Sequence, residues 1–269
     1  MLHYPPCHLP YLWYHSPSMS TIRLLTLTEY LSLPCPEKPW LVEGLIPQES
    51  FVVLWGPPKA GKTLLALQVG LGISRSGTVL GRASHQGPVL LLELDTGHRL
   101  LRTMLDNVRH AGIDVSGPLY LPHPDDLRGH YPVNLLHDQS HLYVHSLISL
   151  CKPSLVIVDC LRELGDHDEN ESGETKKIVS ALKQLTVFHP QHPCACLLLH
   201  HTKKLALVDQ RGQPIDHDPI DVGRGSSYLA GAVDSVWFLH NNVLKVVPRF
   251  TEPSQYRLKQ GPGGWWALS

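Results

Sequence analysis

The feature that most constrains this chain is a glycine-rich loop between a predicted strand and a predicted helix. Residues 56–63 read Gly-Pro-Pro-Lys-Ala-Gly-Lys-Thr, which fits the pattern G-x-x-x-x-G-K followed by Ser or Thr. The apolar run 51–55 predicts a buried strand before the loop, and the pattern after the loop predicts a helix over 62–74. Strand, glycine loop and helix in this order form a phosphate-binding unit, which indicates an α/β fold.

The residue types in this loop suit the phosphates of a bound nucleotide. Glycines allow backbone N–H groups to close around phosphates, and the helix N-terminus adds a partial positive charge. We expect Lys62 to reach the β- and γ-phosphates and the Thr63 hydroxyl to bind Mg²⁺. The predicted nucleotide-binding residues are Gly56, Pro57, Pro58, Lys59, Ala60, Gly61, Lys62, Thr63 and Leu64.

The rest of the chain extends this unit into a larger sheet. Further runs at 88–94, 154–158 and 195–199 are apolar throughout, which is typical of parallel strands covered on both faces. Helices are expected at 99–111, 141–151 and 172–188, and an irregular stretch at 122–138. Two hairpins, 235–247 around Asn241-Asn242 and 256–268 around residues 261–264, predict antiparallel strands at the C-terminal edge.

Composition bounds the domain organisation and the class of protein. Prolines crowd the first 47 residues, and the first 22 lack Asp, Glu, Lys and Arg but contain too many prolines and histidines for a membrane helix or a secretory signal. We predict a disordered or over-extended start over 1–18, an N-terminal segment over 19–46, an ATPase core over 47–250 and a C-terminal hairpin over 251–269.

Charge and cysteine usage narrow the class further. A net charge of −1 with 17% charged residues excludes a disordered tail protein and a strongly basic nucleic-acid coat. Six cysteines without C-x-x-C pairing in a chain of 269 residues favour a reduced, cytoplasmic protein. No membrane contact is expected, because the uncharged N-terminal stretch does not fit a membrane helix. Cys194 and Cys196, which alternate in an apolar strand, are interpreted as core residues.

Acidic residues end two of the predicted buried strands. Asp159 closes the run 155–159, where a carboxylate is costly unless it faces a cation such as Mg²⁺, although it could instead cap the next turn. Glu93 and Asp95 end the run 88–94 and lie two residues apart, so we expect both on the same side of the strand. One of them could orient the water that attacks the γ-phosphate, and the sequence leaves open which.

Several segments, taken in order over residues 40–250, resemble those of RecA-like ATPases. The set is similar above all to the hexameric plasmid and phage replicative helicases of the RepA family. The segments are GPPKAGKT, LLLELDT, LVIVDCLREL, DEN, LLLHHTKK and RGSSYLAGAVDSVWFL.

The resemblance implies a role for individual residues. Asp159 is in the position of the Mg²⁺-binding Walker B acid, and the family's catalytic glutamate aligns with Asp95 rather than Glu93. His201 aligns with a γ-phosphate sensor, and Arg224 with an arginine finger that reaches the nucleotide of a neighbouring subunit. These positions imply Mg²⁺-dependent ATP hydrolysis by a ring, expected to be hexameric, that acts as a helicase on single-stranded DNA in the replication of a plasmid, phage or other mobile element.

A second hypothesis is an ATP-gated assembly or regulatory module that hydrolyses weakly and recruits replication or recombination partners. Asp95 is one methylene shorter than the family's glutamate, and the expected DNA-contacting loop 203–223 has a slight excess of acids. His200 and His201 could be ordinary polar residues, Arg224 a surface ion-pair residue, and residues 168–170 a solvated approach to a helix.

Two conspicuous patterns are assigned structural roles. His137, His141 and His145 would share one helical face, which is interpreted as solvated rather than as a metal site. Trp265 and Trp266 are interpreted as one rim and one core residue of an edge ribbon.

Overall fold

The computed structural model describes residues 24–33, 40–130, 132–165, 172–189, 191–202, 215, 217–223, 227–249 and 251–269. The chain divides into two compact units, Met1–Glu37 and Lys38–Ser269. The first contains the short helix α1 (Leu27–Leu31), which begins with a capping box between Thr26 and Glu29. All further elements belong to the second unit.

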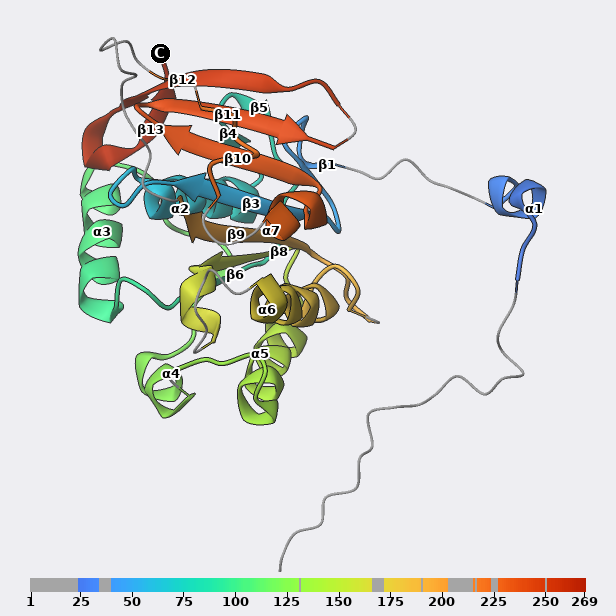
Figure 1. Cartoon of the computed structure of the whole chain (residues 1–269). Helices are drawn as coiled ribbons and strands as arrows, with labels where there is room; N and C mark the ends of the chain where they lie inside the picture. Colours follow the sequence, from blue (N-terminus) through green and yellow to red (C-terminus); the bar gives the residue numbers. More distant parts are fainter. Residues whose placement is uncertain are drawn as a thin grey trace, which may run out of the picture. The chain divides into compact units, whose positions relative to one another are not determined.

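The second unit is built on one large sheet (Figure 1), which in the described residues has the strand order β13-β12-β11-β10-β3-β9-β8-β6-β7. The strands from β10 to β7 in this order are parallel, and β11, β12 and β13 are antiparallel additions. This confirms the predicted α/β class with antiparallel hairpins at the C-terminal edge. The strands are β3 (Phe51–Gly56), β6 (Val89–Glu93), β7 (Leu119–Tyr120), β8 (Leu155–Asp159), β9 (Ala195–His201), β10 (Ser235–His240), β11 (Val243–Pro248), β12 (Ser254–Gln260) and β13 (Trp266–Leu268).

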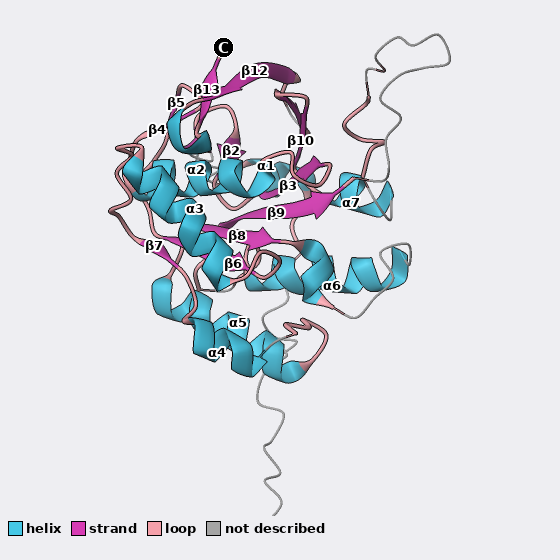
Figure 2. Cartoon of the chain, turned by 90° about the vertical axis from the view of Figure 1, so that its left-hand side faces the viewer, coloured by secondary structure: helices cyan, strands magenta, loops and turns pink. Residues whose placement is uncertain are grey.

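Helices cover both faces of this sheet (Figure 2). One core cluster joins α2 and α3 to side chains such as Val52 and Leu54 of β3, and the other joins α5, α6 and α7 to Phe51 and Val53 of the same strand. Because neighbouring residues of a strand point to opposite faces, both sets of positions must be apolar, which explains the unbroken apolar runs. The helices are α2 (Lys62–Ser74), α3 (His98–His110), α4 (Pro124–His130), α5 (Asp138–Cys151), α6 (Ser172–Leu185) and α7 (Ser227–Ala232).

The structure differs from the sequence prediction in the stretch 122–138, which was expected to be irregular and contains α4. Pro124 occupies the first helical position, acids follow in the first turn, and Arg128 and His130 lie in the last turn. Proline at the first position and this order of charges favour a helix, but seven residues are too few for a clear apolar period.

The predicted segment boundaries at 46/47 and 250/251 fall inside the second compact unit. The hairpin β1 (Trp40–Val42) and β2 (Ile46–Pro47) places Leu41, Val42, Leu45 and Ile46 in the core, and β12 continues the main sheet beside β11. A second small hairpin joins β4 (Thr78–Val79) to β5 (Arg82–Ala83). Among the described residues, no helix has both the length and the apolar character needed to cross a membrane.

Candidate active site

The carboxyl ends of four adjacent parallel strands form the site. In the order β3, β9, β8 and β6, these strands end at Gly56, His201, Asp159 and Glu93. Residues far apart in the sequence therefore lie side by side because the sheet aligns their strand ends. Ligand sites of open α/β sheets lie at this edge.

Glycine is required at two positions of the phosphate loop. A Cβ on Gly56 would lie 2.6 Å from the carbonyl oxygen of Leu239, so a side chain there would collide with backbone. Gly61 has a φ of +89° and is the N-cap of α2. The loop thus passes close to its neighbours and turns sharply into the helix, as a backbone cradle for phosphates requires.

Lys62 is buried at the start of α2 and is held by the loop itself. Its Nζ donates to the carbonyl oxygens of Gly56 (2.9 Å) and Pro57 (3.1 Å) and lies 3.4 Å from Nδ1 of His201. Burial lowers the pKa of Lys62, and the charge of Asp159 partly opposes this effect. The ammonium is therefore positioned in the loop and gains from any anion placed there.

Thr63 and Asp159 form an oxygen pair beside the lysine. Thr63 Oγ1 donates to Asp159 Oδ2 at 2.5 Å, and the Asp159 side chain is buried. Burial raises the pKa of Asp159 to about 6; the Thr63 hydrogen bond lowers it, and the charges of Glu93 and Asp95 raise it further. The positive charge near Asp159 does not offset the cost of burying its carboxylate. A hydroxyl beside such a carboxylate provides the oxygen ligands that Mg²⁺ prefers.

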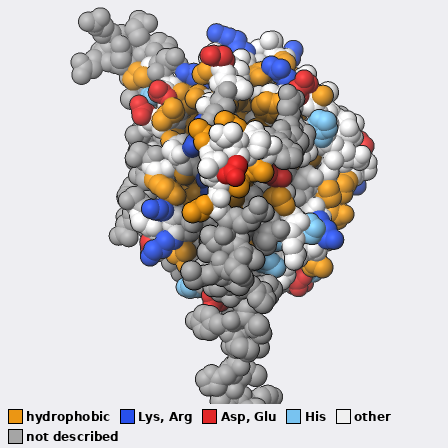
Figure 3. Space-filling model, turned by 90° about the vertical axis from the view of Figure 1, so that its right-hand side faces the viewer, with side chains coloured by type: hydrophobic (Ala, Val, Ile, Leu, Met, Phe, Trp, Pro, Cys, Tyr) orange, Lys and Arg blue, Asp and Glu red, His pale blue; other side chains and the backbone are white. Residues whose placement is uncertain are grey.

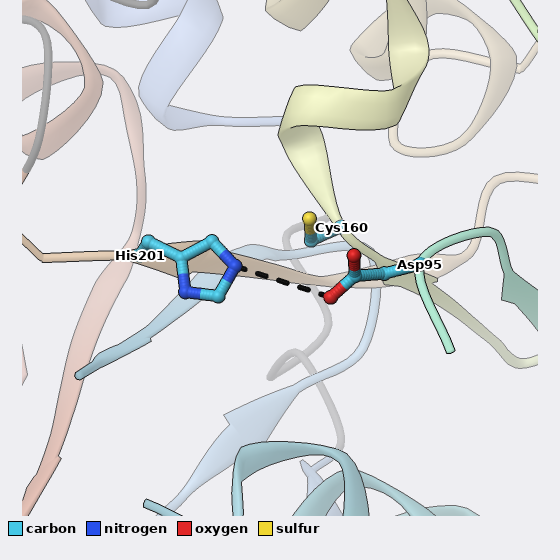
Figure 4. Close-up of side chains that lie close together, drawn as sticks. All are labelled: Asp95, Cys160 and His201. Carbon is cyan, nitrogen blue, oxygen red and sulfur yellow. Dashed lines mark ion pairs between the residues drawn. The ribbon is translucent and has the colours of Figure 1, made fainter. Parts of the chain in front are cut away.

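The two carboxylates after β6 have different surroundings. Glu93 is buried and accepts hydrogen bonds from the backbone N–H groups of Thr96 and Gly97. Asp95 is 46% exposed, and its Oδ2 lies 4.0 Å from Nε2 of His201 (Figure 4). Glu93 ends β6 and Asp95 lies in the bend that follows, so the two carboxylates do not belong to one strand as expected, although the charges of both act on Asp159.

The adjacent histidines of β9 also differ. His201 is partly exposed at the strand end and contacts the Lys62 and Asp95 side chains, whereas His200 is buried in the register position next to Trp55 of β3. Arg224, residues 168–170 and most of the loop 203–223 lie outside the described residues, so the geometry of the predicted arginine finger and DNA loop is not defined.

Two contributions to the site were missed in the sequence. Cys160, directly after Asp159, is buried next to Asp95 and His201, and burial raises its thiol pKa to about 12. Trp266 of β13 packs on the phosphate loop, since a Cβ on Gly61 would lie 2.7 Å from its ring. Gln68 of α2 holds the Trp266 backbone by accepting from its N–H (3.0 Å) and donating to its carbonyl (2.7 Å).

The tryptophan pair was correctly interpreted as core plus rim, because Trp266 is buried and Trp265 is partly exposed. Its proximity to the phosphate loop could not be read from the sequence. That contact depends on the sheet order, which brings the C-terminal strand to α2, and the sequence separation is about two hundred residues.

The fold and the site define a RecA-like P-loop ATPase. The defining features are a glycine loop after a central parallel strand, a lysine and a threonine at the start of the following helix, and an aspartate that ends a nearby strand. The chain belongs to the AAA domain family, whose sequence profile matches residues 18–206. A search of curated proteins found no match.

Solved structures share the fold. A KaiC-like protein from the hyperthermophilic archaeon Pyrococcus horikoshii OT3 superimposes with a TM-score of 0.50 at 16% sequence identity, covering 85% of this chain and 93% of that chain. At this identity the likeness concerns the fold.

Proposed function

We propose that this chain hydrolyses ATP in a Mg²⁺-dependent reaction at the edge formed by β3, β9, β8 and β6. The observation that supports this most directly is the convergence of Lys62, the Thr63–Asp159 pair, His201 and Asp95 at adjacent strand ends. An ammonium, an oxygen pair for a cation and an exposed carboxylate are the groups that phosphoryl transfer to water requires.

Each group has a distinct task. Lys62 exchanges the carbonyl oxygens of Gly56 and Pro57 for phosphate oxygens, and Thr63 and Asp159 hold Mg²⁺. Mg²⁺ held there would neutralise negative charge on the triphosphate. His201 lies between Lys62 and Asp95, and we assign to it the donation of a hydrogen bond to the γ-phosphate.

Asp95 rather than Glu93 is proposed to orient the attacking water. Both oxygens of Glu93 accept backbone hydrogen bonds, whereas Asp95 is exposed beside His201. Asp95 accepts a hydrogen bond from the water, whose oxygen bonds to the γ-phosphorus as the bond to the ADP oxygen breaks. The proton of this water passes to Asp95 and from there to solvent. In this reading Glu93 positions the loop that carries Asp95.

The finer proposal is a ring-forming motor, expected to be hexameric, in which Arg224 of one subunit completes the site of the next. The resemblance to the RepA family supports a DNA helicase acting on single-stranded DNA in the replication of a mobile element. Steady-state ATP hydrolysis with and without single-stranded DNA, with Lys62→Ala as the inactive control, tests this proposal. Stimulation of several-fold by DNA supports the motor, and turnover that ignores DNA contradicts it.

The alternative is an ATP-gated assembly module with weak hydrolysis. The short side chain of Asp95 supports it. On the face drawn in Figure 3, the coloured Lys and Arg side chains are scattered among acids and apolar groups and form no basic stripe for a phosphate backbone. Asp95→Glu separates the two proposals. A motor already suited to aspartate loses turnover, whereas a weak hydrolase limited by the missing methylene gains it.

A further inference from the structure

Three side chains of metal-binding type lie together beside the Thr63–Asp159 pair. Asp95, Cys160 and His201 each place one potential ligand atom within 4.8 Å of the other two. Figure 4 shows the imidazole and the carboxylate facing each other with Cys160 between their strand ends. Cys160 has no task in the proposed hydrolysis, so its place in this cluster calls for a separate explanation.

The sheet sets the spacing of the three residues. β6, β8 and β9 are adjacent parallel strands, with β8 in the middle. His201 ends β9, Cys160 directly follows the end of β8, and Asp95 follows β6 after a single residue. Since neighbouring strands lie about 4.8 Å apart, hydrogen bonding of the sheet maintains this proximity.

The donor atoms distinguish this cluster from the Mg²⁺ site. A thiolate, an imidazole and one carboxylate suit Zn²⁺, whereas Mg²⁺ takes oxygen ligands. Zinc bonds of about 2.0–2.3 Å in a tetrahedron place ligand atoms roughly 3.3–3.8 Å apart. The 4.0 Å between His201 Nε2 and Asp95 Oδ2 is close to this value. The Asp95 side chain is 46% exposed, so a small closing movement toward His201 would not have to displace a buried group.

We propose that Asp95, Cys160 and His201 form a zinc site, separate from the Mg²⁺ site, whose occupancy blocks ATP hydrolysis. On binding, the Cys160 thiol releases its proton to solvent as the Zn–S bond forms, and no group is oxidised or reduced. Three protein ligands leave one coordination position for water. Zinc binding stands on this geometry alone, and only the inhibition rests on the proposed function of Asp95 and His201.

The local charges favour a second dication. The carboxylates of Asp159, Glu93 and Asp95 make the electrostatic potential here more negative. Among the described residues, the charges that act on Asp159 include one ammonium, that of Lys62. Zinc at Nε2 of His201 requires a proton on Nδ1, which the Lys62 ammonium faces at 3.4 Å. Lys62 can give up this contact, because it also donates to the carbonyl oxygens of Gly56 and Pro57.

Co²⁺ provides a test that is independent of activity, because a cobalt–thiolate bond gives a charge-transfer absorption that histidine and carboxylate ligands do not give. The full chain is titrated with Co²⁺ and then with Zn²⁺, which should displace it at a stoichiometry of one. Cys160→Ser should abolish the absorption and weaken zinc binding by more than the about 10- to 100-fold typical of losing an outer partner. Cys151→Ser, a half-buried cysteine outside the cluster, is the matched control.

Asp95→Asn provides a second test that remains valid if the buried Cys160→Ser variant does not fold. It changes an exposed ligand, so it should weaken zinc binding and keep the cobalt–thiolate absorption. Absence of the absorption in the folded wild type, or its persistence in Cys160→Ser, overturns the site. ATP hydrolysis in the presence of Mg²⁺ is then compared with and without Zn²⁺ for the wild type, Cys160→Ser and Cys151→Ser, each against its own zinc-free rate. Zinc inhibition that is equal in the wild type and in Cys160→Ser overturns the blocking role. A wild type that binds zinc but hydrolyses no ATP contradicts the proposed function and leaves the metal site standing.

Discussion

Replacing the buried Asp159 with asparagine should stabilise the protein in the absence of nucleotide and Mg²⁺. Its folded-state pKa of about 6 exceeds the ordinary value of 3.8, so at neutral pH folding must desolvate an ionised carboxylate. Each pKa unit corresponds to about 1.4 kcal/mol, and a difference of about 2 therefore costs about 3 kcal/mol at pH 7.5. Asparagine removes this cost and keeps an oxygen that can accept from Thr63.

The pH dependence identifies the cause. A raised carboxyl pKa contributes stability below the unfolded value of 3.8, and this contribution is lost as pH rises through about 6. The advantage of Asp159→Asn should therefore fall from about 3 kcal/mol at pH 7.5 to about 1 kcal/mol at pH 4.5, apart from a pH-independent term for burying the amide. In a chain of this size the larger value corresponds to roughly 6–12 °C in the unfolding temperature.

The assay is thermal unfolding of both proteins across this pH range with a chelator present. Asp95→Asn is the matched control, because that carboxylate is exposed and its loss should change stability by less than about 0.5 kcal/mol. A difference between wild type and Asp159→Asn that stays constant with pH, or that grows toward low pH, would refute the reasoning. Added Mg²⁺ and ATP should stabilise the wild type and have little effect on Asp159→Asn.

Three further predictions follow from single contacts. Trp266→Ala should destabilise the protein by about 3–5 kcal/mol and weaken ATP binding, as measured by unfolding and by nucleotide titration. Trp266→Phe should retain most of the stability and most of the ATP affinity. Equal behaviour of the two variants would exclude a packing role of the ring at Gly61. Glu93→Gln should cost about 1–2 kcal/mol of stability, because it removes one acceptor for backbone N–H groups. Asp95→Asn should abolish turnover without unfolding the chain. The reverse pattern would assign water activation to Glu93 and the structural role to Asp95. Burial, followed by the charges of His145 and His192, lowers the pKa of His189. The contribution of His189 to stability is therefore complete above about pH 6.5 and is lost as the pH falls. The variant His189→Asn keeps an acceptor for the backbone N–H of His192 and should reduce this loss when unfolding is measured between pH 7 and 5, and an unchanged pH profile would contradict the prediction.

The sequence carried the central strands of the fold for a specific physical reason. Strands that are buried on both faces must be apolar at every position. The strands β3, β8 and β9 could therefore be predicted from unbroken apolar runs in the sequence. Elements with few buried side chains were not visible. Helix α4 buries no residue fully, and the strands β4 and β5 have only two residues each.

For the site, local spacing alone was enough to predict phosphate binding by Lys62 and Mg²⁺ binding by Thr63, because the loop and the helix that begins after it are continuous in the chain. The distinction between Glu93 and Asp95 required the structure, since it depends on where β6 ends and which backbone N–H groups face each carboxylate. The contacts of Trp266 with Gly61 and of Cys160 with Asp95 and His201 likewise depend on the strand order. Sequence pattern determines which residues can bind phosphate, and the register of the sheet decides which distant side chains share that site, because pairing between strands is set by tertiary packing.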